Sequence, residues 1–149
     1  MTNFIVIIGY GNTLRSDDGV GQIVATEIES WKLPSVKSHS LHQLTPELAD
    51  ILAQSSYAIF IDACPATEIG ETIQIYPLEP IDSNNFSLGH ISNPRSLLAL
   101  TQALYSYTPP ACAIAIPAVN FDLGETLSPI AKLGITQALQ KIQNLIPHH

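Results

Sequence analysis

Basic residues are scarce in this chain. Lys and Arg together number six, against thirteen Asp and Glu, and the formal net charge is −7 at pH 7. Nucleic-acid binding depends on basic side chains that neutralise phosphates, and no stretch of this sequence gathers them. We therefore expect no nucleic acid among the partners. The acidic surplus suits a cation or a basic peptide, although such a surplus also serves solubility alone.

Cysteines and long apolar runs are also few. Cys64 and Cys112 have neither metal-ligand spacing nor the density of a disulfide framework, which favours a reducing compartment. The first apolar run is short and has no basic flank, so no secretory signal is expected, and no run is long enough to span a membrane. The sequence predicts a cytoplasmic monomer with a single domain, residues 1–149, and no membrane partner.

Strand-like and helix-like segments alternate along the chain. Apolar runs at 4–8, 57–61 and 111–116 are typical of strands covered on both faces, with weaker strands at 36–41 and, as an edge or hairpin strand, 72–76. Apolar residues at helical spacing begin at Val20, and three cap-then-proline pairs open further helices: Thr45-Pro46, Asn93-Pro94 and Ser128-Pro129. This alternation predicts an α/β three-layer sandwich, with a mostly parallel sheet and helices on both faces.

A glycine-rich turn that carries two aspartates follows the first strand. Residues 9–21 read GYGNTLRSDDGVG. Such turns usually offer N–H groups to a phosphate, but Asp17 and Asp18 would repel one, so this turn favours a metal ion or a basic peptide. A dinucleotide site is disfavoured, because Leu14 occupies the third glycine position and no acidic residue ends the second strand.

Three separate segments bring possible metal ligands to one edge of the predicted sheet. Asp17 and Asp18 follow the first strand, Asp62 ends a central strand, and His90 precedes a helix. Two carboxylates and an imidazole form a plausible ligand set for a divalent transition metal, with positions left open for a substrate. Each residue also has a plainer interpretation. Asp17 and Asp18 suit a helix start, Asp62 could cap a turn, and His90 could simply be solvated.

The first motif resembles the signature of the hydrogenase maturation endopeptidases. The matching positions are Gly9-x-Gly11-Asn12-x-Leu14-x-x-Asp17-Asp18-Gly19-x-Gly21, followed in order by Ile61-Asp62-Ala63, the His90 segment and Ile116-Pro117. Members of this family remove a C-terminal extension from the large subunit of nickel–iron hydrogenases after nickel insertion. The segment His42-Gln43-Leu44-Thr45-Pro46-Glu47-Leu48 looks like the branch that serves bidirectional, NAD(P)-linked hydrogenases.

The resemblance implies an endopeptidase, aspartyl-type or metal-assisted, that recognises nickel carried by the precursor and needs no organic cofactor. By position, the nickel ligands are Asp18, Asp62 and His90, and the catalytic residues are Asp18, Asp62 and Asp17, with Asp17 or Asp62 as a possible general base. The residues expected to contact the substrate are Gly9, Gly11, Asn12 and His42. Two other hypotheses stay open: a nickel-sensing or chaperone module without proteolysis, and a nucleotide-binding α/β domain.

Overall fold

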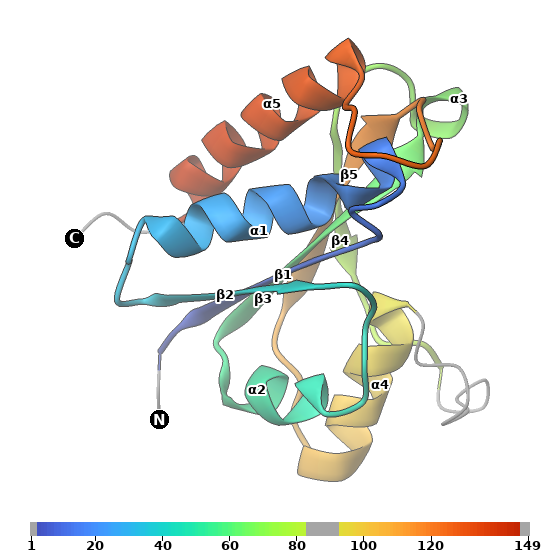
Figure 1. Ribbon diagram of the computed structural model, residues 1–149. Coiled ribbons are helices and arrows are strands. Elements are labelled where there is room, and N and C mark those ends of the chain that lie inside the picture. The colour runs from blue at the N-terminus through green and yellow to red at the C-terminus, as the bar shows by residue number, and fades with distance from the viewer. Residues whose placement is uncertain (1–2, 83–92, 147–149) are drawn as a thin grey trace.

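The apolar runs form the central strands of one sheet. The computed structural model describes residues 3–82 and 93–146, and in this part of the chain the strand order is β2-β1-β3-β5-β4 (Figure 1). The parallel strands are β1 (Ile5–Tyr10), β2 (Val36–Leu41), β3 (Tyr57–Pro65) and β5 (Ala111–Ala118). Strand β4 (Gln74–Leu78) is an antiparallel edge strand, as expected for the segment near 72–76.

Helices cover both faces of the sheet. Figure 1 shows α1 (Val20–Ser30) and α5 (Pro129–Leu145) on one face, and α2 (Leu48–Gln54) and α4 (Pro94–Tyr105) on the other. Two buried apolar clusters lie between these layers, one on each face. The predicted three-layer α/β architecture is thus confirmed. No helix within residues 3–82 and 93–146 has both the length and the apolar character to cross a membrane.

Two of the three predicted helix caps form as expected. The side chains of Asn93 and Ser128 accept hydrogen bonds from the N–H groups of Ser96 and Ala131, and a proline follows each cap. The cap at Thr45 was wrong, because α2 starts only at Leu48 and a tight turn precedes it, in which Leu48 N–H donates to the Thr45 carbonyl. A short helix that the sequence did not predict, α3 (Ala66–Ile69), follows β3.

Close packing between α1 and the sheet explains most of the glycine motif. A side chain at Gly9 would collide with the carbonyl oxygen of Gly21, and one at Gly21 would collide with the carbonyl oxygens of Ile61 and Tyr10. Gly11 has a φ of 142°, which side-chain-bearing residues rarely adopt, and a side chain there would meet the carbonyl of Asp18. The glycines therefore bring the aspartate turn close to the ends of β1 and β3.

We expect Gly21→Ala to lower the free energy of unfolding by about 2–3 kcal/mol, because the added methyl group has no space between α1 and β3. Urea unfolding of the purified protein would measure the change. Thr26→Ala is a matched control in the same helix, at an exposed position, and should change stability by less than about 0.5 kcal/mol. Equal stability of the two variants would contradict the close packing.

Candidate functional site

The connections of the sheet place a topological switch point between β1 and β3. Strand β1 lies between β2 and β3, so the chain leaves β1 toward one side of the sheet and later returns to the other. Its two connecting helices, α1 and α2, cover opposite faces (Figure 1). In parallel sheets of this kind, ligands bind beyond the carboxyl ends of the strands where the order reverses. The aspartates predicted as site residues lie at this point.

The structure brings Asp18 and Asp62 close together. Asp18 belongs to the short 3-10 helix η1 (Ser16–Gly19) that follows β1, and the backbone N–H of Asn12 donates a hydrogen bond to its carboxylate at 2.9 Å. Asp62 lies within β3, which continues to Pro65 because it pairs with β5 as far as Ala118. The prediction that β3 ends at Asp62 was therefore wrong, but the two carboxylates are near enough for their charges to interact.

Asp62 is a largely buried carboxylate with few hydrogen-bond donors. Burial is the main influence on its pKa, which rises from 3.8 to about 6. Hydrogen bonds from the Ala63 N–H, at 2.8 Å, and from the Tyr10 hydroxyl lower this pKa in part, whereas the negative charge of Asp18 raises it. A cation between Asp18 and Asp62 would relieve both the repulsion and the cost of burial.

Asp17 has a different environment. Its side chain is fully buried and accepts four hydrogen bonds of 2.7–2.9 Å, from the N–H groups of Val119, Asn120 and Ser128 and from the Ser128 hydroxyl. Burial alone would raise the pKa of Asp17, but these hydrogen bonds outweigh it and the pKa is lowered. Both carboxylate oxygens are engaged, so the geometry favours an anchoring role. The catalytic role expected from the sequence stays a prediction.

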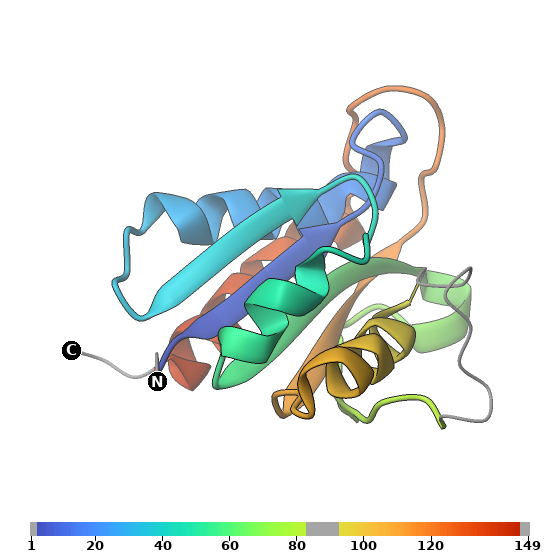
Figure 2. The same cartoon turned by 90° about the horizontal axis from the view of Figure 1, so that it is seen from below.

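Asp17 joins the loop after β1 to the loop after β5. Figure 2 shows the two loops side by side, and backbone hydrogen bonds link Ser16 N–H to the Gly124 carbonyl and Gly124 N–H to the Leu14 carbonyl, both at 2.8 Å. The Ser128 hydroxyl donates to Asp17 and also accepts from the N–H of Ala131 at the start of α5. The turn that holds Asp18 is therefore supported from the far end of the sequence.

Comparison with known proteins gives matches only at the level of structure. No protein-family model matches the sequence, and no curated protein matches it. Among solved structures, the [NiFe] hydrogenase maturation protease HycI from Thermococcus kodakarensis KOD1 aligns over 95% of this chain and 91% of that one, with 21% identity and a TM-score of 0.69. The hydrogenase maturating endopeptidase HybD from E. coli aligns over the same shares, with 18% identity and a TM-score of 0.72. The chain has the fold of these proteases.

A further structure extends this likeness over nearly the whole of both chains. The [NiFe] hydrogenase maturation protease HybD from Thermococcus kodakarensis aligns over 97% of this chain and 99% of that one, with 20% identity and a TM-score of 0.70. Very little of either chain lies outside the alignment. The shared fold is therefore that of the whole neighbouring structure rather than of a part of it.

The residues expected to contact a substrate occupy varied positions in this maturation-protease fold. Gly9 is buried and serves the packing of α1, a place that does not favour substrate contact. Gly11 and Asn12 lie in the turn beside Asp18. His42 is exposed and directly follows β2. The last residue of β2, Leu41, accepts a hydrogen bond from the Gly11 N–H. Substrate contact by these residues stays a prediction. His90 lies outside the described residues.

The described residues supply two of the three predicted metal ligands. No group of three or more His, Cys, Asp or Glu residues that could hold a metal occurs within 3–82 and 93–146. Asp18 and Asp62 nevertheless offer two oxygen donors whose mutual repulsion a divalent ion would relieve. Such a pair suits an ion that brings further ligands with it.

Sequence reasoning missed Tyr10 and gave no role to Ser128 beyond its helix cap. Tyr10 is the last residue of β1 and lies next to Asp62 on the neighbouring strand. Tyr10 lies two residues after the buried Ile8 and therefore on the same face of the strand. This period of two was the signal in the sequence that could have identified it. Cys64, a free cysteine two residues after Asp62, has a pKa raised by burial and by Glu68, and this disfavours a reactive thiolate.

Proposed function

We propose that this protein is an endopeptidase that removes the C-terminal extension of a nickel–iron hydrogenase large-subunit precursor after nickel insertion. The observation that carries the proposal is the pair Asp18 and Asp62 at the switch point of a sheet with the maturation-protease fold. The motif resemblance and the likeness to solved structures of hydrogenase maturation proteases support the same activity. In this proposal the nickel arrives with the precursor and is part of the substrate.

The residues of the site have separate roles in this proposal. Asp18 and Asp62 provide oxygen ligands to the precursor's nickel, with His90 as the predicted nitrogen ligand. The Asn12 N–H orients the carboxylate of Asp18, and the Tyr10 hydroxyl orients that of Asp62. Asp17 anchors the turn that carries Asp18 to the segment before α5. A divalent ion held by these carboxylates would supply Lewis acidity toward a carbonyl or a water molecule, and would position the peptide attached to it.

We further propose that the precursor belongs to a bidirectional, NAD(P)-linked hydrogenase. The segment 42–48 supports this choice through its resemblance to that branch. In the structure it starts directly after Leu41, which is hydrogen-bonded to the turn that carries Asp18. A precursor docked at the aspartate pair would meet this segment. Processing of the large subunit of a bidirectional hydrogenase in preference to that of an uptake hydrogenase would test the assignment.

Incubation with nickel-loaded and nickel-free precursor tests the activity itself. We expect the loaded precursor to lose its extension and the nickel-free precursor to be processed at least about 100-fold more slowly, because Asp18 and Asp62 then repel each other without a cation between them. Mass spectrometry of the product measures both the extent and the position of cleavage. The comparison uses one protease preparation, so its folding state is the same in both reactions.

Two outcomes would contradict the proposal in different ways. Efficient cleavage of nickel-free precursor in the presence of a strong chelator would indicate a peptidase that recognises the extension by its sequence. Binding of the loaded precursor without cleavage would favour the alternative, a nickel-sensing or chaperone module. The second outcome keeps the site and removes only the reaction.

A further inference from the structure

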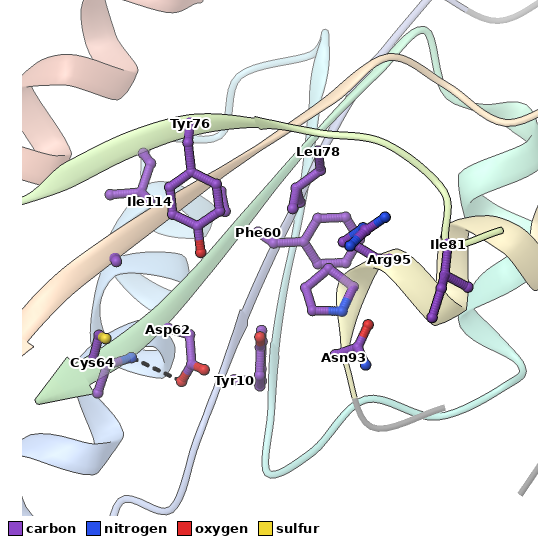
Figure 3. Close-up of a pocket in the computed structure, with 14 residues that line it drawn as sticks. Tyr10, Phe60, Asp62, Cys64, Tyr76, Leu78, Ile81, Asn93, Arg95 and Ile114 are labelled. Atoms are coloured by element: carbon purple, nitrogen blue, oxygen red, sulfur yellow. Dashed lines mark hydrogen bonds between the residues drawn. The ribbon is translucent and has the colours of Figure 1, made fainter. Parts of the chain in front are cut away.

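Asp18 and Asp62 are held in place by different means. Asp62 is fixed by the strands around it, since the Ala63 N–H donates to its carboxylate at 2.8 Å and the Tyr10 hydroxyl lies on the other side (Figure 3). Asp18 lies in the turn after β1, where its carboxylate accepts a hydrogen bond from the backbone N–H of Asn12 at 2.9 Å. The direction of Asp18 therefore depends on the direction of the Asn12 N–H.

The peptide group that carries this N–H joins Gly11 to Asn12. Gly11 has a φ of 142° and no side chain, so the backbone rotates readily at this point. The N–H of Gly11 donates to the Leu41 carbonyl at 3.1 Å, but that N–H belongs to the preceding peptide group. A trans peptide group is planar, and its C=O and N–H point in opposite directions. A contact to the Gly11 carbonyl therefore sets the direction of the Asn12 N–H as well.

Gln22 of α1 provides this contact. Its side-chain Nε2 donates a hydrogen bond to the Gly11 carbonyl oxygen at 2.6 Å, in a partly buried position. A carbonyl oxygen only accepts, so the amide nitrogen of Gln22 faces it. A chain of hydrogen bonds thus runs from Gln22 through one peptide group to Asp18. Each bond in such a chain strengthens the next by polarising the group between them.

The packing of α1 brings Gln22 to this place. The neighbouring residue, Gly21, has no side chain to keep the helix away from the carbonyl oxygens of Tyr10 and Ile61. Gln22 is the third residue of α1, and helical side chains lean toward the start of their helix, so Gln22 leans back over the turn. A glutamate would suit this position in a helix equally well. The nitrogen donor is what distinguishes glutamine here.

We infer that Gln22 is a positioning residue for Asp18. The inference rests on the proposed function and adds a residue that acts on the metal site from the helix behind it. By holding the Gly11–Asn12 peptide group, Gln22 keeps the Asp18 carboxylate directed toward Asp62 and the nickel between them. Without Gln22 the peptide group turns, and Asp18 loses the N–H that orients it. A displacement on the order of 1 Å in a reacting site lowers the rate by as much as about 100-fold.

Three variants of Gln22 separate the donor from the shape of the side chain. Gln22→Glu keeps the shape without the donor, Gln22→Met keeps the length without it, and Gln22→Lys keeps a donor of similar reach. We expect Glu and Met to lower kcat/KM for the nickel-loaded precursor by about tenfold or more, and Lys to retain most of the wild-type value. A role in packing alone predicts another order, with Glu closest to wild type.

The Asn12 amide gives a second measurement that needs neither nickel nor precursor. In chelator-treated, ¹⁵N-labelled protein, we expect this N–H to exchange with solvent at least about tenfold faster in Gln22→Met than in wild type, and Gln22→Lys to restore slow exchange. Gln137→Met in α5 is the matched control. It removes another half-buried hydrogen bond between a glutamine and the backbone, to the Ile73 N–H at 3.4 Å, and should change neither the Asn12 exchange nor the cleavage rate.

Three results would overturn the inference. Unchanged exchange of the Asn12 amide in Gln22→Met would show that Gln22 does not hold this peptide group. Faster exchange together with wild-type cleavage would show that the held direction of Asp18 does not matter to the reaction. A wild-type rate for Gln22→Glu would show that the turn does not require the donor.

Failure of the proposed function would look different from failure of this inference. Wild-type protein that leaves the nickel-loaded precursor uncleaved overturns the proposed function, and the role of Gln22 in cleavage with it. The exchange of the Asn12 amide would still report whether Gln22 holds the turn, because that measurement involves the protein alone.

Discussion

Replacement of Asp17 by alanine is expected to lower the free energy of unfolding by about 3–4 kcal/mol. The carboxylate is fully buried, and its loss leaves the N–H groups of Val119, Asn120 and Ser128 and the Ser128 hydroxyl without their acceptor. Two loops separated by more than a hundred residues lose their connection at the same time. Urea unfolding at neutral pH measures the change.

The effect of Asp17→Ala should also depend on pH. The pKa of Asp17 is lower in the folded protein than its ordinary value of 3.8, so its stabilising contribution is complete above that value and is lost as the pH falls through the folded-state pKa. The difference in stability between wild type and variant should therefore be largest above about pH 5 and shrink in stronger acid. Asp122→Ala, at an exposed position in the adjacent loop, is the control and should change stability by less than about 0.5 kcal/mol.

This variant also separates the two roles considered for Asp17. An anchoring residue affects stability first, and activity falls because Asp18 is no longer held in place. A variant as stable as wild type that fails to cleave the precursor would contradict the anchoring role and favour the general base expected from the sequence.

The architecture could be predicted because the signals for its strands and helices lie within short stretches of sequence. Continuous apolar runs marked the buried strands, and the pairs Asn93-Pro94 and Ser128-Pro129 marked two helix starts correctly. The error at α2 is local, because a tight turn at Thr45 precedes the helix, whereas the error at β3 has a tertiary cause. Strand β3 continues past Asp62 only because β5 lies beside it, and periodicity within one segment carries no information about that pairing.

The candidate site could be predicted only in part. Asp18 and Asp62 could be placed together because parallel strands end at one edge of the sheet. The partners of Asp17 could not be found, since Val119 and Ser128 are more than a hundred positions away. Asp17 and Asp18 are adjacent in sequence and equivalent in chemistry, yet one is buried and saturated with hydrogen bonds while the other faces Asp62.

Replacement of Asp62 by asparagine is expected to reduce cleavage of the nickel-loaded precursor on the order of 100-fold or more, because the amide keeps the shape of the side chain but removes the charge opposite the ion. The rate is measured from the mass of the processed subunit. Asp50→Asn in α2 removes one exposed carboxylate and should cleave at the wild-type rate. Wild-type turnover by Asp62→Asn would exclude Asp62 as a ligand or a catalytic group.

Loss of activity in this variant should come with a gain in stability. The pKa of Asp62 rises from 3.8 to about 6 on folding, so the ionised side chain opposes the folded state above pH 6, and this cost disappears once the group is protonated in both states, below about pH 4. In chelator-treated protein, Asp62→Asn should therefore be more stable than wild type at pH 8 and lose that advantage at pH 4. A variant that is both inactive and less stable at pH 8 would instead indicate that Asp62 supports the fold. A binding role for Asp62 requires a charged group at the ligand site even though that charge lowers the stability of the fold.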